Sequence, residues 1–228
     1  MTRLYFEQEM LRLQEQVLLY GNTVENALRD AVALLMTLDQ AGTEDIMERY
    51  REIVATHGRI EDDTLALIAT QQPMATDLRL LAAILEISSE LERIGDYARG
   101  IARITQLLGD NPKVPAPQAI IPMVTQARDM MLRALQCFIH NDAQNARLIP
   151  REDDAVDTLF RQVERELMNH IIADPTCIEH ANYYLWAAHN LERSADRVTN
   201  ICERIVFTVS GEMRELETTM RKPGISGI

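Results

Sequence analysis

A short acidic motif occurs twice in this chain, about one hundred residues apart. Leu91-Glu-Arg-Ile-Gly-Asp96 recurs as Leu191-Glu-Arg-Ser-Ala-Asp196. In each copy the two acids are four residues apart, so on a helix both side chains project from one face. Carboxylate oxygens gathered on a helix face suit hard or borderline cations such as Mg²⁺, Mn²⁺ and iron, and also Zn²⁺. The pairs Glu92/Asp96 and Glu192/Asp196 are therefore candidate metal ligands.

A second acidic segment precedes each motif. Asp153 and Asp157 are also four residues apart, and Glu61 aligns with Asp157 when the middle segments of the two halves are matched by their acids. Two helices that bring such pairs together would gather four carboxylates, which requires protons, arginines or metal ions for neutrality. The alternative is an ordinary solvated face whose acids pair with the nearby arginines Arg93, Arg99, Arg193 and Arg197.

The apolar residues recur at steps of three and four, which predicts helices nearly throughout and no sheet. Glycines, prolines and polar turns divide the chain, and the expected helices cover about 4–40, 44–70, 75–107, 122–140, 143–172 and 177–210. The proline-rich stretch 109–117 separates three helices from three others. We therefore predict an all-α protein with a first unit at 1–108, a linker at 109–117, a second unit at 118–217 and a disordered tail at 218–228.

Composition narrows the function classes. The formal net charge of −12 opposes binding to nucleic acid and to anionic lipid. Three cysteines without close spacing argue against a disulfide framework or a thiolate zinc site, which fits a reducing cytoplasm. The N-terminus lacks the pattern of a signal peptide, and charged or amide residues interrupt every apolar run before the length of a membrane span. We therefore expect a cytoplasmic protein.

Three blocks together resemble the signature of the PhoU family: Gln71-Gln-Pro-Met-Ala-Thr-Asp-Leu-Arg79, Leu91-Glu-Arg-Ile-Gly-Asp-Tyr-Ala98 and Asn190-Leu-Glu-Arg-Ser-Ala-Asp-Arg-Val-Thr-Asn-Ile-Cys-Glu203. The resemblance covers about residues 5–217. It implies two tandem three-helix bundles related by a pseudo-twofold repeat, with a multinuclear metal cluster of iron, Zn, Mn or Mg on each. The ligand candidates that it implies are Glu92, Asp96, Asp153, Asp157, Glu192, Asp196, Asn200 and Glu203, with Glu61 as the counterpart of Asp157.

The first half departs from this pattern. His57 stands where the same matching of acids places Asp153, while Gly100 and Arg103 stand where the second half has Asn200 and Glu203. The first half thus has fewer obvious ligands, and Arg103 is a candidate to neutralise its acids without metal. We predict that the second half binds metal more tightly.

The family resemblance also implies a role. Similar proteins are cytoplasmic adaptors, not enzymes, that couple the ATPase subunit of the phosphate ABC transporter to a membrane sensor histidine kinase and keep phosphate-starvation genes off. They reach the membrane only through these partners, and we expect a homodimer. Three alternatives stay open at this point: a carboxylate-bridged di-metal enzyme, against which the lack of any Glu-x-x-His motif counts; a purely structural bundle; and a regulator of a sodium–phosphate cotransporter or ion channel.

Overall fold

The computed structural model describes residues 3–211 and 216, and in this part of the chain every regular element is a helix. The elements in chain order are α1 (Arg3–Thr37), α2 (Thr43–Gln71), α3 (Thr76–Leu108), α4 (Ile120–His140), α5 (Ala143–Ala146), η1 (Ile149–Glu152), α6 (Asp153–Ala173), η2 (Pro175–Cys177) and α7 (Ile178–Ser210). The expected all-α class is confirmed, and its six long helices are α1, α2, α3, α4, α6 and α7. The tail predicted at 218–228 lies outside the described residues.

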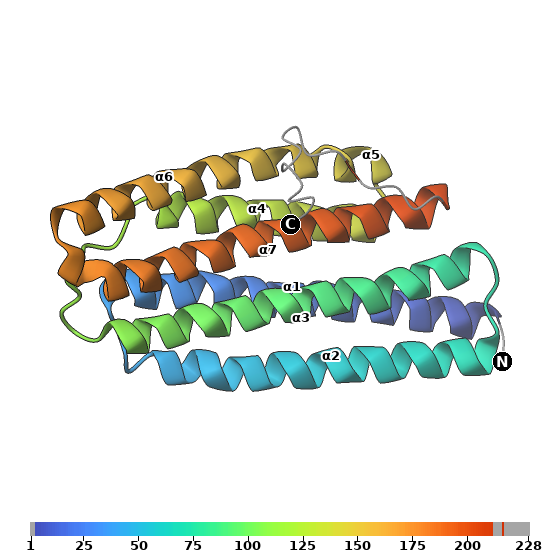
Figure 1. Ribbon diagram of the computed structural model, residues 1–228. Coiled ribbons are helices and arrows are strands. Elements are labelled where there is room, and N and C mark those ends of the chain that lie inside the picture. Colours follow the sequence, from blue (N-terminus) through green and yellow to red (C-terminus); the bar gives the residue numbers. More distant parts are fainter. Residues whose placement is uncertain (1–2, 212–215, 217–228) are drawn as a thin grey trace, which may run out of the picture.

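The long helices form two three-helix bundles that lie side by side with their axes roughly aligned (Figure 1). The first bundle holds α1, α2 and α3, and the second holds α4, α6 and α7. They join where α3 packs against α7 and α1 packs against α4. Buried apolar residues of both bundles belong to one continuous hydrophobic core, so the two halves pack against each other and do not form separate cores.

The burial pattern reveals how the halves correspond. Along α2 the buried positions Ile46, Ile53 and Ile60 each have a buried apolar counterpart 103 residues later, at Ile149, Val156 and Val163. The same shift relates α1 to α4, where buried Val24 and Ala31 match Ala127 and Ala134. In α3 and α7 the shift is one hundred, as the repeated motif requires. The internal repeat is thus a repeat of packing as well as of sequence.

The predicted fifth helix at 143–172 is wrong as a single element. The structure divides it into the short α5, the 3₁₀ turn η1 and then α6, which starts only at Asp153. Pro150 lies in η1. Proline has no N–H to donate and clashes with a preceding turn, so a continuous α-helix through this position is unfavourable.

The stretch 109–117 contains no helix and closes the end of the molecule between α3 and α4. It is packed rather than loose: Val114 is buried, and the backbone N–H of Lys113 donates to His180 Nδ1 over 3.0 Å. The connection therefore fixes the start of α7 against the end of α3.

Candidate functional site

The two motif-bearing helices meet at the centre of the molecule. α3 and α7 run antiparallel (Figure 1), and they approach so closely that a Cβ on Gly100 would lie 2.9 Å from Asn190 Nδ2. Polar contacts follow the same seam, since Arg197 Nη1 lies 3.3 Å from Glu90 Oε2 and both side chains are largely buried. Each acidic motif is therefore held rigidly beside the boundary between the halves.

In the first half, the acids of the motif already have donors. The hydroxyl of Tyr50, on α2, donates to Glu92 Oε1 over 2.8 Å. Arg99 donates from Nε and Nη2 to the same Asp96 oxygen, over 3.0 and 2.5 Å. The Arg99 guanidinium also lies over the Tyr50 ring, 4.7 Å from its centroid, within the range of a cation–π contact. These four residues form what we call the first-half cluster.

The first-half cluster affects the ionisation of its tyrosine. Burial is the main cause that raises the pKa of Tyr50, and its hydrogen bond to Glu92 raises that pKa further. Burial likewise raises the pKa of Tyr20, on α1, and the charge of Glu92 adds to the effect. Because an ionised carboxylate disfavours a second negative charge nearby, both phenols stay protonated at neutral pH.

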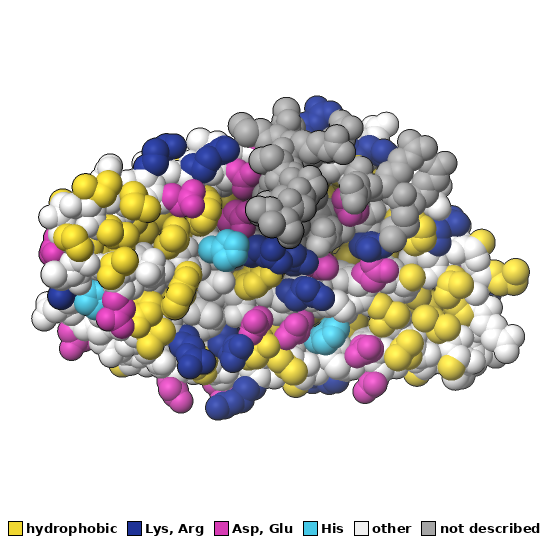
Figure 2. All heavy atoms as spheres, viewed as in Figure 1, with side chains coloured by type: hydrophobic (Ala, Val, Ile, Leu, Met, Phe, Trp, Pro, Cys, Tyr) yellow, Lys and Arg dark blue, Asp and Glu magenta, His cyan; other side chains and the backbone are white. Residues whose placement is uncertain are grey.

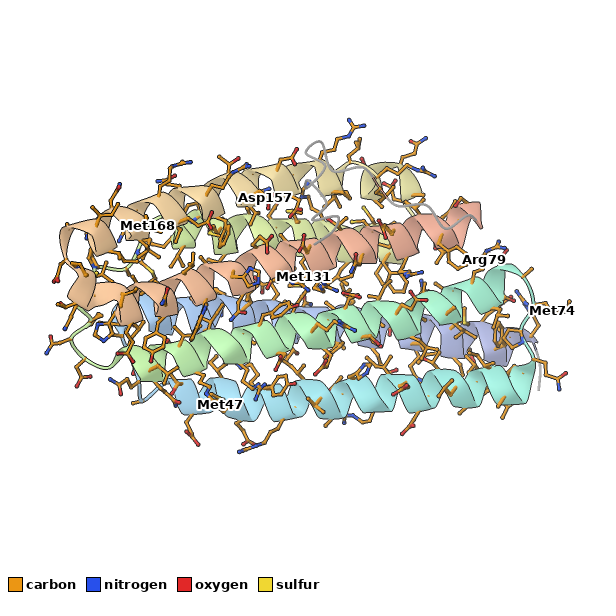
Figure 3. The ribbon with its side chains drawn as sticks, in the orientation of Figure 1. Met47, Met74, Arg79, Met131, Asp157 and Met168 are labelled. Atoms are coloured by element: carbon orange, nitrogen blue, oxygen red, sulfur yellow. The ribbon has the colours of Figure 1, made fainter. Side chains whose placement is uncertain are left out.

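In the second half, the acids are more deeply buried and lie between α6 and α7. Asp153 is 4% exposed and Glu192 is 8% exposed. The two helices are antiparallel neighbours joined at 174–177, so Asp153 and Asp157 lie level with about residues 198 and 194 of α7. Figure 3 labels Asp157 on α6, the helix that packs against α7. The candidate acids of both helices thus share one stretch of the seam, with Asp196 at its centre.

A histidine and an arginine lie at the edge of this seam. His189 Nδ1 lies 3.4 Å from Glu192 Oε2. A hydrogen bond to Tyr97 is the main cause that raises the pKa of Arg193, and the charges of Asp196 and Glu192 add to it. The Arg193 guanidinium therefore interacts both with Tyr97 of the first half and with the acids of the second half.

The last two candidates lie further along α7, and both are partly exposed. Asn200 is one turn beyond Asp196. Glu203 accepts a hydrogen bond from the backbone N–H of Leu216 over 2.9 Å, and Leu216 packs on the core. The structure thus brings the chain beyond α7 back to this carboxylate.

The structure does not bring Glu61 to the motif of its own half. Glu61 is exposed, and because α2 and α3 are joined at 72–75 it lies level with about residue 86 of α3 rather than with Glu92. Under the shift of 103 residues Glu61 corresponds to Glu164, and Asp153 corresponds to Tyr50 rather than to His57. The pairing of Glu61 with Asp157 is therefore corrected.

Sequence reasoning missed two residues that complete the first half, Tyr20 and Tyr50, which belong to no acidic pattern. Arg99 was among the arginines expected to pair with these acids on a solvated face, and it contacts Asp96, whereas Arg103 was the arginine expected to neutralise them in place of metal. The signal that could have found Tyr50 is the periodicity of buried isoleucines in α2, which fixes the register that pairs it with Asp153.

The two halves differ in how well they fit a metal ion. In the first half, a metal ion would have to displace Arg99 from Asp96 and would then lie close to the positive charge of the same guanidinium. These residues therefore do not fit a metal ion. In the second, two buried carboxylates lie on facing helices, and their oxygens match hard metal ions. As placed, no three Asp, Glu, His or Cys side chains within residues 3–211 and 216 are arranged to hold one ion, so ligation there requires the side chains to turn toward a common point.

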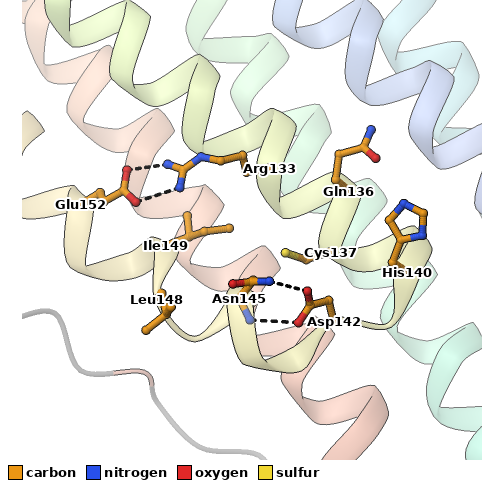
Figure 4. A pocket seen from close by; sticks show the side chains of 9 residues that line it. All are labelled: Arg133, Gln136, Cys137, His140, Asp142, Asn145, Leu148, Ile149 and Glu152. Atoms are coloured by element: carbon orange, nitrogen blue, oxygen red, sulfur yellow. Dashed lines mark hydrogen bonds and ion pairs between the residues drawn. The ribbon is translucent and has the colours of Figure 1, made fainter.

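A separate cavity of about 370 Å³ lies between α4 and the segment from α5 to η1 (Figure 4). Its lining includes Arg133, which makes a two-pronged ion pair with Glu152, and Asp142, which accepts from Asn145. The charged groups are thus already paired within the wall.

Across the described part of the chain, no helix combines the length and the apolar character needed to cross a membrane.

Comparisons with known proteins agree with this duplicated architecture. The family model described as "PhoU domain" matches residues 17–105 and 120–205, one match in each half. A "Phosphate-specific transport system accessory protein PhoU homolog" of Clostridium acetobutylicum is 29% identical over 217 residues, covering 95% of this chain and 99% of that protein. The corresponding protein of Serratia marcescens is 32% identical over 207 residues, covering 91% of this chain and 85% of that protein.

Solved structures share the fold of this chain. The crystal structure of the phosphate transport system regulatory protein PhoU from Streptococcus pneumoniae superposes with a TM-score of 0.86 at 28% identity, covering 92% of this chain and all of that one. PhoU from Pseudomonas aeruginosa superposes with a TM-score of 0.82 at 30% identity, covering 91% of this chain and all of that one.

Proposed function

Because this chain belongs to the PhoU family, we propose that it is an accessory protein of a phosphate-specific transport system and regulates phosphate uptake and the phosphate-starvation response. The observation that carries the proposal is the match of the family domain to both halves, together with a shared fold over nine-tenths of the chain. In its finer form the protein is a cytoplasmic adaptor. It links the ATPase subunit of the transporter to a membrane sensor histidine kinase and holds that kinase back when phosphate is plentiful.

The proposed role is regulatory rather than catalytic. The relatives are named accessory or regulatory proteins. A net charge of −12 favours partners with basic surfaces and opposes nucleic acid. The protein would reach the membrane through its partners.

An exposed apolar patch supports docking to another protein. It lies where α6 ends and α7 begins, at the left of Figure 2, and its members are Met168, Ile172, Ile178 and Trp186. Trp186 is 55% exposed. Contiguous apolar side chains on a surface are typical of protein interfaces, and a second copy of the chain in a homodimer is one such partner.

The second half is the proposed metal centre. Asp153, Asp157, Glu192 and Asp196 would supply its oxygens, with Asn200 and Glu203 as further ligands. Iron, Mn, Mg or Zn would supply positive charge that offsets the repulsion among these acids and ties α6 to α7. The burial of Asp153 and Glu192 supports this assignment.

A reporter of phosphate starvation, such as secreted alkaline phosphatase, tests the regulatory role. In phosphate-rich medium a host without the gene should express the reporter, and the wild-type chain should restore repression. We expect Asp153→Asn/Glu192→Gln to lose repression. The control, Glu61→Gln/Glu164→Gln, removes two exposed charges, one from α2 and one from α6, and should repress normally. A reporter that stays off in the host without the gene would refute the regulatory role, and full repression by Asp153→Asn/Glu192→Gln would refute the role of the second-half acids.

A further inference from the structure

The two acidic motifs have the same sequence pattern but different neighbours at equivalent positions. Tyr50 faces Glu92 in the first half, and its counterpart in the second half is the buried acid Asp153. Arg99 contacts Asp96, and its counterpart is Thr199. The Thr199 hydroxyl oxygen is buried and has no hydrogen-bond partner among the described residues, so no cation replaces the missing arginine from this position.

The charge difference continues along the helix. One turn beyond Arg99 lies Arg103, and one turn beyond Thr199 lies Glu203. At three equivalent positions, therefore, the first half carries a phenol and two cations, whereas the second carries two acids and a neutral hydroxyl. At these positions the first half carries positive charge that offsets the Coulomb repulsion between its motif acids. The same positions of the second half carry none.

The contacts of Arg99 form a continuous chain through the first-half cluster. Its Nε and Nη2 donate to one oxygen of Asp96, and its Cζ lies over the Tyr50 ring, 4.7 Å from the centroid. The Tyr50 hydroxyl in turn donates to Glu92. A guanidinium that makes an ion pair and a cation–π contact together has few orientations that satisfy both. Arg99 is thus a positioned cation, connected to both acids of the motif.

We infer that Arg99, held by Tyr50, is a built-in counterion that takes the place of a metal ion in the first half, so that metal binding in this chain is confined to the second half. The inference deepens the proposed metal centre and rests on it for the second half. Its claim about the first half is independent, because it depends only on contacts among Tyr50, Glu92, Asp96 and Arg99.

The test gives the first-half cluster the side chains that the second half has at two equivalent positions. Arg99→Thr and Tyr50→Asp, singly and together, install the side chains of Thr199 and Asp153 at the equivalent positions. Full-length protein is stripped with a chelator and titrated with Mn²⁺, and the signal of the free ion is followed by electron paramagnetic resonance. Circular dichroism checks that each variant keeps its helices. Arg99→Thr changes a side chain that is 43% exposed, so it remains interpretable if the double variant fails to fold.

In the wild type, we expect Mn²⁺ binding to be unchanged by Glu92→Gln/Asp96→Asn and to weaken at least tenfold in Asp153→Asn/Glu192→Gln. The graft should add a binding event that Glu92→Gln/Asp96→Asn abolishes. The matched control, Arg93→Thr, removes an exposed arginine of the same helix that is not one of the three positions compared above, and it should add none.

Two results would overturn the inference: wild-type binding that weakens tenfold when Glu92 and Asp96 are neutralised, or grafted variants that gain no binding. If the wild type binds no Mn²⁺ at all, the proposed metal centre of the second half fails. The graft still decides the first half in that case, since a gain on removing Arg99 supports its role and no gain refutes it.

Discussion

A charged pair at the boundary between the halves offers the sharpest test of how they are held together. Glu25 on α1 and Arg128 on α4 occupy equivalent positions, 103 residues apart, and contact each other through Arg128 Nε and Nη2 and Glu25 Oε1. The Glu25 side chain is only 7% exposed. Replacing Arg128 by Ala leaves this carboxylate in the interface without its cation.

The expected cost follows from burial. Removing one partner of a buried ion pair costs roughly 3–5 kcal/mol, because the remaining charge is left without compensation. The Arg128 side chain is 27% exposed, so water reaches part of the pair, and we expect the lower end, about 3 kcal/mol. For a chain of this size that corresponds to a fall of roughly 6–12 °C in melting temperature.

The assay is urea unfolding, supported by calorimetry. Arg12→Ala is the control: this arginine pairs with two acids, Glu9 and Asp63, but its side chain is 45% exposed, so we expect a loss of at most about 1 kcal/mol. Replacing both Glu25 and Arg128 by Leu should recover most of the loss, because the unpaired charge is gone. A loss below about 1 kcal/mol for Arg128→Ala, or a double variant as unstable as the single one, would refute the reasoning.

Three further outcomes follow from particular contacts. A Cβ at Gly95 would lie 2.9 Å from Ile53 Cγ2, so Gly95→Val should cost about 1–3 kcal/mol by overcrowding, visible as a lower urea midpoint. The pKa of Tyr50 is raised in the folded state, so the stability it contributes is fully present below about pH 10 and declines above it. The loss of unfolding free energy caused by Tyr50→Phe should therefore be constant from pH 7 to about 10 and shrink at higher pH; a loss that grows there would contradict this. All three cysteines are buried, and burial raises the pKa of Cys202 and Cys137, so a thiol reagent should label them only slowly in the native protein and at once in urea.

Much of the fold was predictable because helix periodicity is a strong local signal. Five of the six helix spans expected from the sequence differ from the structure by at most a few residues, since glycine, proline and polar turns mark their ends. The fifth span failed at Pro150, where one proline was enough to insert a 3₁₀ turn into an otherwise helical pattern.

The site was less predictable because it depends on register between helices. Matching the halves by their acids paired Glu61 with Asp157, whereas buried isoleucines and valines set a different register. An acid on the surface can occupy a different position in each repeat at little cost in stability. A buried apolar residue cannot, because a shift of one position places its side chain on another face of the helix. The apolar positions therefore carry the reliable correspondence, and they identify Tyr50 as the partner of Glu92.

The tandem arrangement permits asymmetry that two identical chains could not have. In a symmetric dimer, a residue on the twofold axis faces its own copy, so a glutamate there would meet a glutamate. Within one chain the equivalent positions can differ, and here Glu25 meets Arg128. The same freedom allows Arg99 to pair with one acid of the first motif and Tyr50 to hydrogen-bond to the other, while Thr199 and Asp153 stand at the equivalent positions of the second half. A repeat can thus keep its packing positions while the charged groups around its two acidic motifs differ.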